Sequence, residues 1–123
     1  MRDIVHKNQD LRDRTKRFAV RILRMFERLP KGIAAQTVGR QVLRSGTSVA
    51  ANYRESSRAR SRSEFIAKLG IVEQELDESM LWFELLIEAE TVPEAKLQDL
   101  MKETDELQRI IAASIRKAKN RRT

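Results

Sequence analysis

Cysteine is absent from this 123-residue chain, which excludes disulfides and thiolate metal sites. Glycine and proline number only 4 and 2, too few for the many tight turns of an all-β protein. No apolar run approaches the roughly 18 residues that a membrane-spanning helix needs, and residues 1–10 lack the apolar core of a secretory signal peptide. These absences lead us to expect a cytoplasmic protein without membrane contact.

Sequence signatures of catalysis and cofactor binding are missing as well. His6 is the only histidine, so neither a Ser-His-Asp triad nor the Glu-x-x-His pair of di-iron bundles is indicated. Glycine-rich phosphate loops are absent. The pairs Glu73 with Asp77 and Glu84 with Glu88 could hold a cation, but surface charge is the favoured interpretation. We expect no catalytic residue, no cofactor and no metal site.

Helical periodicity fills four segments, separated by proline-containing turns at residues 29–32 and 91–94 and a polar break at residues 55–61. The segments run from about 10 to 29, 34 to 54, 61 to 90 and 91 onward, and each repeats apolar residues at spacings of three and four. Asp10, Ser61 with Glu64, and Thr91 with Glu94 are candidate helix caps. We predict an all-α, antiparallel up-down four-helix bundle, one domain over residues 1–123, with residues 1–9 and 117–123 flexible.

The second segment is rich in small residues, among them Gly39, Ser45 and Gly46. A glycine inside a helix costs about 1 kcal/mol relative to alanine. We expect the close approach of a neighbouring helix to offset that cost, and regard a kink or a ligand contact as a weaker interpretation.

Charge is distributed in three blocks along the chain, whose formal net charge is +7. Residues 1–62 hold 16 Lys/Arg against 5 Asp/Glu, residues 63–108 hold 3 against 13, and residues 109–123 hold 6 against none. The chain is therefore basic, then acidic, then basic.

Two charged stripes at helical spacing carry this asymmetry. The basic stripe in the first segment is formed by Arg14, Arg17, Arg21, Arg24 and Arg28. The acidic stripe in the third segment is formed by Glu73, Asp77, Glu84 and Glu88. Either stripe could be no more than a solvated face. In an up-down bundle the first and third helices are diagonal, so these stripes could meet only between subunits.

Apolar residues away from the core stripe also indicate a buried second surface. Ile71, Trp82 and Leu85 share one side of the third segment, and tryptophan is enriched at interface centres. We therefore predict a homo-oligomer with a head-to-tail interface. Its expected residues are Arg17, Arg21, Arg24, Ile71, Glu73, Asp77, Trp82, Glu84, Leu85 and Glu88.

Nucleic acid is a second predicted partner. Phosphates of RNA or DNA could be contacted, without reading of the sequence, by three groups of basic residues. These are the basic stripe, the cluster Arg54, Arg58, Arg60 and Arg62, and the tail residues Arg116, Lys117, Lys119, Arg121 and Arg122. Aromatic residues make up only 5% of the chain, so base stacking is poorly supported. A protein-binding adaptor or antitoxin-like module, with a protein partner and no nucleic-acid contact, remains the alternative.

A resemblance to a known family rests on residues 41–52, QVLRSGTSVAAN, then residues 60–65, RSRSEF, and then Leu69, Glu75 and Leu76. This pattern resembles the four-helix-bundle proteins encoded in intervening sequences of bacterial 23S rRNA genes. It is also similar to the accessory proteins of diversity-generating retroelements.

The resemblance implies an antiparallel four-helix bundle, a homopentamer and no established enzymatic activity. The residues that match the family pattern are Asn52, Glu55, Ser63, Glu64 and Phe65. Helix capping explains Ser63 and Glu64, and the core explains Phe65, whereas the sequence gives no structural reason for Asn52 or Glu55. We therefore predict a non-enzymatic, oligomeric scaffold that presents a basic surface.

Overall fold

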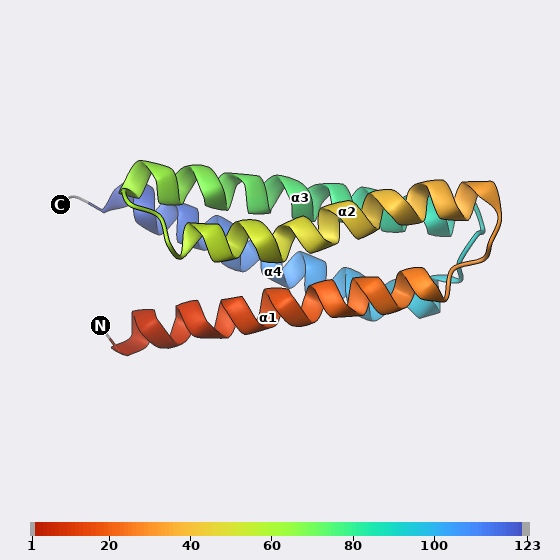
Figure 1. Cartoon of the computed structure of the whole chain (residues 1–123), viewed down its shortest axis with the longest axis horizontal. Coiled ribbons are helices and arrows are strands. Elements are labelled where there is room, and N and C mark those ends of the chain that lie inside the picture. The colour runs from red at the N-terminus through yellow and green to blue at the C-terminus, as the bar shows by residue number, and fades with distance from the viewer. Residues whose placement is uncertain (1, 122–123) are drawn as a thin grey trace.

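Four long helices account for nearly all of the structure (Figure 1). The computed structural model describes the backbone of residues 2–121 and the side chains of residues 9–121. The helices are α1 (Arg2–Glu27), α2 (Ile33–Ser56), α3 (Arg62–Glu88) and α4 (Glu94–Asn120). They run alternately up and down, and no strand occurs in the described part of the chain. The prediction of an all-α four-helix bundle is confirmed.

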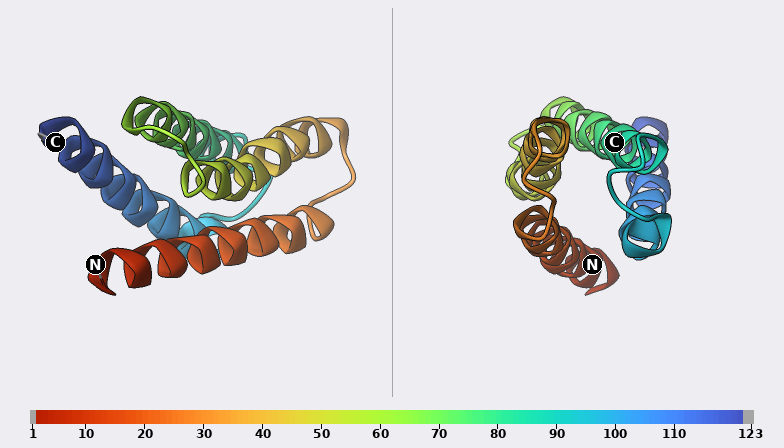
Figure 2. Two further views of the ribbon diagram at one scale, coloured as in Figure 1. Left: turned by 60° about the vertical axis from the view of Figure 1, so that its left-hand side comes forward. Right: turned by 90° about the vertical axis from the view of Figure 1, so that its right-hand side faces the viewer.

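Neighbouring helices do not pack equally closely. α2 packs most extensively against α3, α1 packs against α2 and α3 packs against α4, whereas α1 and α4 meet over only a few residues. The left view in Figure 2 shows α1 and α4 diverging toward the two ends of the chain. Over the described residues, the backbones of α1 and α3 do not approach each other, so these two helices are diagonal as predicted.

One hydrophobic core runs along the bundle axis. Each helix contributes the periodic apolar positions expected from the sequence, for example Phe18 from α1, Val42 from α2, Leu76 from α3 and Leu107 from α4. On α3, however, Leu86 is fully buried while Phe65 lies only partly buried against the core. Burial of these apolar positions holds the four helices together, because helices in proteins gain most of their stability from packing.

Glycines on α2 allow α1 to approach closely. A Cβ atom on Gly46 would lie 2.7 Å from Cγ1 of Ile22, and a Cβ atom on Gly39 would overlap Leu29. Both glycines are buried at the α1–α2 contact. The sequence prediction that the small residues of this segment admit a neighbouring helix is therefore confirmed.

Of two predicted helix caps, one is confirmed and one is wrong. Ser61 caps α3, since its hydroxyl accepts the N–H of Glu64 at 3.1 Å, as predicted. The predicted cap at Thr91 is wrong, because α4 begins after Pro93, whose extended backbone precedes the first turn without a side-chain cap. Glu90 supplies the reversal after α3 with a left-handed φ of 57°, a conformation that usually favours glycine.

α1 extends further than the sequence suggested. It begins at Arg2 rather than near Asp10, so the predicted N-cap at Asp10 is wrong. Residues 2–9 contain neither proline nor glycine, and a helix nucleated by the packed segment can extend through them one residue at a time. Met1 and residues 122–123, part of the segments predicted to be flexible, lie outside the described residues.

Candidate interaction surfaces

The basic stripe of α1 lies beside the seam between α1 and α4. Arg14 is half-buried there and donates to Glu103 through Nε and Nη2, both at 2.8 Å, and its Nη2 lies 3.0 Å from Glu106. The hydrogen bond to Glu103 raises the pKa of this guanidinium. Arg14 therefore joins α1 to α4 within one chain and does not form part of an outward surface as the sequence suggested. Periodicity alone could not show which side of α1 faces α4.

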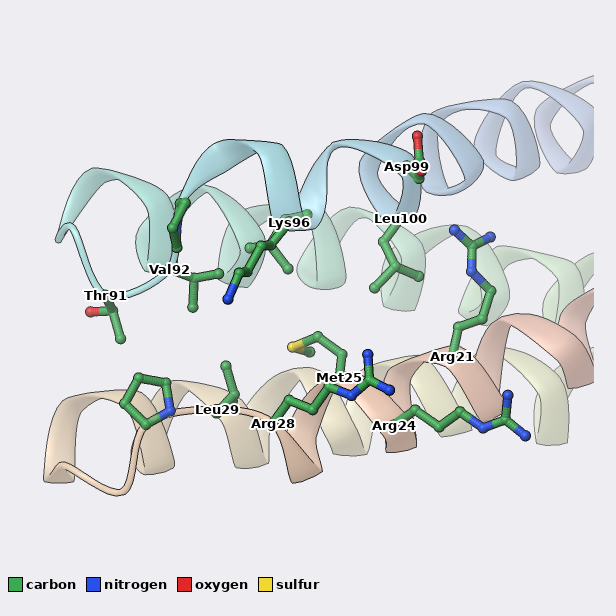
Figure 3. A pocket seen from close by; sticks show the side chains of 13 residues that line it. Arg21, Arg24, Met25, Arg28, Leu29, Thr91, Val92, Lys96, Asp99 and Leu100 are labelled. Atoms are coloured by element: carbon green, nitrogen blue, oxygen red, sulfur yellow. The ribbon is translucent and has the colours of Figure 1, made fainter.

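Further along this seam, α1 and α4 enclose an open cleft of about 410 Å³, here called the α1–α4 cleft (Figure 3). Its apolar floor includes Met25, Leu29 and Leu100, while Val92 and Leu97 extend it toward the start of α4. Arg21, Arg24 and Arg28 of the basic stripe line one wall, and Lys96 and Asp99 line the other. This cleft was not predictable from the sequence, because its two walls lie about 70 residues apart in the chain.

The α1–α4 cleft carries an excess of positive charge. Four cations, Arg21, Arg24, Arg28 and Lys96, surround it against the single carboxylate of Asp99. Among the described residues, none of these four cations forms an ion pair. An apolar floor with an unneutralised basic rim suits a ligand that is both apolar and anionic. Arg17, the remaining member of the stripe, is exposed to solvent.

The outer surface of α3 has the opposite charge. Asp77, Glu84 and Glu88 are exposed, and Leu81 and Leu85 lie beside them with 45% and 40% of their surface accessible. We call these five residues the acidic α3 face. Leu81 was missed in the sequence, although its spacing of four from Leu85 is the same signal that singled out the other residues.

Three residues predicted for this surface lie at its margins. Ile71 is exposed, and Glu73 is half-buried. Trp82 differs from the prediction, because it packs partly against the core and is not a fully outward anchor. Its indole Nε1 is buried without a hydrogen-bond partner among the described residues. The helical spacing placed Trp82 away from the core stripe, but its large ring reaches back across the helix surface to the core side chains.

Basic residues from two distant segments meet at one end of the bundle. The turn between α2 and α3 and the end of α4 lie at the same end because the helices alternate in direction (Figure 1). The residues gathered there, here called the basic end, are Arg54, Arg58, Arg60, Arg62, Arg116, Lys117, Lys119 and Arg121. All are exposed except Arg62, which is half-buried, and none of them forms an ion pair with a described residue.

The aromatic ring of Tyr53 does not belong to this surface. Tyr53, which precedes the turn, is only 5% exposed, and burial raises the pKa of its hydroxyl to about 12. It is therefore a core residue and cannot stack on an unpaired base.

The residues that match the family pattern have structural roles in this fold. Asn52 donates from Nδ2 to the carbonyl of Ser48 at 2.9 Å, and Glu55 accepts from Nζ of Lys68 at 2.7 Å, joining α2 to α3. That hydrogen bond raises the pKa of Lys68. Asn52 and Glu55, unexplained from sequence, thus have local partners.

Glu64 and Ser63 lie at the start of α3 near the cap. Glu64 accepts the backbone N–H of Arg60 through Oε2 at 3.2 Å, which completes the capping interaction. Ser63 is exposed, 3.3 Å from the hydroxyl of Ser61.

A second polar cluster joins α2 to α3 at mid-height. Arg44 pairs with Glu75 at 2.9 Å and with Glu78 at 3.2 Å. Burial raises the pKa of Glu75, and its hydrogen bond to Glu78 acts in the same direction. The pKa of Glu78 is lowered, first by the hydrogen bond from Glu75 and then by Arg44. When the pair holds one proton, Glu75 carries it.

No group of three potential metal ligands occurs among the described residues. His6 lies within α1, but its side chain is outside the described ones. Within the described part of the chain, no helix is long and apolar enough to cross a membrane.

Comparison with known proteins identifies the family. The family model for the 23S rRNA-intervening sequence protein matches residues 7–113. A solved structure from Bacteroides thetaiotaomicron, described as a protein with unknown function from the S23 ribosomal protein family, is 34% identical. It aligns with a TM-score of 0.83 over 89% of this chain and 98% of its own. No curated protein sequence matches the chain. The expected similarity to retroelement accessory proteins stays a prediction. The chain belongs to the 23S rRNA-intervening sequence protein family.

Proposed function

We propose that this protein is a non-enzymatic, homo-oligomeric scaffold whose basic end binds the phosphate backbone of RNA or DNA. The observation that carries the proposal is the meeting of two separate basic segments at one end of the bundle, where none of the eight basic side chains forms an ion pair with a described residue. Exposed arginine and lysine side chains bind phosphates mainly by displacing condensed counterions. Seven exposed residues of this kind, together with the half-buried Arg62, provide a substantial electrostatic surface on one subunit.

The mode of binding follows from which residues are absent from the basic end. Tyr53 is buried, and Phe65 is partly buried against the core, so neither offers a free ring for stacking. Sequence-specific recognition of single strands relies heavily on such rings. The basic end therefore supports contacts to phosphates, with affinity that depends on salt rather than on base sequence.

A homo-oligomer would carry one basic end on each subunit. A closed ring of subunits aligns several basic ends, and binding at several linked sites raises the overall affinity without new contacts. The family description refers to an intervening sequence of 23S rRNA, and the Bacteroides protein is assigned to a ribosomal protein family. Both names are consistent with a nucleic-acid setting, and the resemblance to the family implies a homopentamer.

The test is a fluorescence anisotropy titration of labelled RNA and DNA 20-mers, single- and double-stranded, at several salt concentrations. We expect binding that weakens steeply with salt, and we expect Arg58→Ala/Arg60→Ala to reduce the slope of log K against log salt by about two. The control variant Arg40→Ala/Lys16→Ala removes two exposed cations elsewhere and should keep the slope.

Two results would contradict the proposal. Absence of binding at low salt, or binding that does not depend on salt, would instead favour the protein-binding adaptor. An equal effect of both double variants would show that total charge, not the basic end, is responsible.

A further inference from the structure

The α1–α4 cleft is left open by the fold of a single chain. Its floor is formed by Met25, which is half-buried, and by Leu29 and Leu100, which are 7% and 6% exposed, at the seam where the bundle is least closed. Its rim carries three arginines and Lys96, none of them in an ion pair with a described residue. The basic end, which lies at the opposite end of the bundle, does not account for this site (Figures 1 and 3).

The acidic α3 face has the complementary pattern. Leu81 and Leu85 are one helical turn apart and project apolar surface, while Asp77, Glu84 and Glu88 surround them with negative charge. An amphipathic helix that presents apolar residues at this spacing is the usual occupant of a groove between helices. Three carboxylates on this face stand against four cations around the cleft.

The α1–α4 cleft and the acidic α3 face also lie at the same height along the bundle. The cleft lies at the end of α1 and the start of α4, and Leu81 to Glu88 form the last two turns of α3. All three segments are at the same end of the molecule (Figure 1). A rotation about an axis parallel to the helices therefore brings the two surfaces to the same height without sliding one chain past the other.

The two surfaces cannot meet within a single chain, because α1 and α3 are diagonal. Surfaces on opposite sides of a subunit form head-to-tail contacts, and these close into a ring when the rotation between subunits permits.

We infer that the α1–α4 cleft of one copy receives the acidic α3 face of a second copy, with Leu81 and Leu85 packed on the apolar floor. This inference rests on the homo-oligomer of the proposed function and names the surfaces that form it. Arg24 and Arg28 face Glu84 and Glu88 of the second copy in this arrangement. The contact weakens as salt rises, because its ionic part is at the rim and is screened.

A charge-swap experiment tests this pairing, with the mass in solution measured by light scattering at low salt. The cleft variant is Arg24→Glu/Arg28→Glu, the α3 variant is Glu84→Arg/Glu88→Arg, and a third protein carries all four changes. The control is Arg40→Glu/Lys16→Glu, which reverses two exposed cations elsewhere. Circular dichroism checks that each variant is helical, and Lys96→Glu replaces the cleft variant if that variant is not.

We expect each of the two double variants to fall to the mass of one chain, the fourfold variant to regain the wild-type mass, and the control to keep it. Wild-type mass in both double variants would overturn the inference. Loss of assembly in the double variants without recovery in the fourfold variant would also overturn it, because the two surfaces would then not face each other. A monomeric wild type would instead contradict the oligomer itself, so the two failures are distinguishable.

Discussion

Ser45 of α2 and Ser79 of α3 face each other across the most extensive helix contact, with their hydroxyl oxygens 2.8 Å apart in a fully buried site. Ser79 donates to the carbonyl of Glu75 at 2.9 Å, which leaves its oxygen to accept from Ser45. The carbonyl of Val42 is only a distant alternative for Ser45, at 3.4 Å. Ser45 therefore needs Ser79 as its hydrogen-bond acceptor, whereas Ser79 has an acceptor of its own.

This inequality predicts which serine is the more costly to remove. Ser79→Ala leaves the Ser45 hydroxyl without a good acceptor in the core and should lower the free energy of unfolding by about 1–3 kcal/mol. Ser45→Ala leaves Ser79 bonded to Glu75 and should cost only about 0.5–1.5 kcal/mol. Urea unfolding of both variants measures the difference, and an equal or reversed order would contradict this arrangement.

Two glycines with different surroundings predict opposite effects of the same substitution. Gly46→Ala places a methyl group 2.7 Å from Cγ1 of Ile22 and should destabilise the protein by about 1–3 kcal/mol through overpacking. Gly70 is also within a helix, but a Cβ atom there would meet nothing within 4 Å. Gly70→Ala should stabilise the protein by about 0.5–1 kcal/mol. Thermal unfolding compares them, and a stabilising Gly46→Ala would show that α1 does not approach α2 closely there.

The raised pKa of Glu75 predicts a pH dependence of stability. Because the folded protein binds this proton more tightly than the unfolded chain, the Glu75 contribution is fully present below the ordinary value of 4.5 and is lost as pH rises through the folded pKa. Glu78, whose pKa is lowered, acts in the opposite direction below 4.5. Glu75→Gln imitates the protonated acid and should flatten the decline above 4.5. Urea unfolding between pH 4 and 7 tests this, and parallel profiles for variant and wild type would refute it.

Arg14 and Glu103 predict a measurable coupling between α1 and α4. Their side chains are 20% and 16% exposed, so water screens the pair only partly. A double-mutant cycle with Arg14→Met and Glu103→Gln should give a coupling of about 1–2 kcal/mol, above that of exposed pairs. The exposed pair Arg109 and Asp105 within α4 is the matched reference, expected near 0.3–0.5 kcal/mol. Equal coupling in both cycles would mean that Arg14 does not hold the seam together.

Most of the fold was predictable because its determinants are local. Buried residues such as Ile22, Val49 and Ile111 lie in the segments where apolar residues repeat at spacings of three and four, and the polar cap at Ser61 located the start of α3. The start of α1 was not predictable, because residues 2–9 include several weak helix formers and have no apolar rhythm to distinguish helix from a polar extension.

The interaction surfaces were predictable only in part, because they depend on how helices are placed beside one another. The arginine stripe was visible in the sequence, but its division into Arg14, which pairs with α4, and Arg21, which lines the cleft, depends on the rotation of α1 in the bundle. Lys96 completes the cleft from a distant segment without any sequence signal. In the same way, Arg116 joins Arg58 at the basic end only through the alternation of helix directions.

The mass of the wild-type protein in solution tests the scaffold most directly. Light scattering on a sizing column, at low and at high salt, should give a multiple of the 14.3 kDa chain near five at low salt, and a smaller species as salt screens the charged rim. A mass of 14.3 kDa at low salt, on well-folded protein, would contradict the assembled scaffold and the pairing of the α1–α4 cleft with the acidic α3 face.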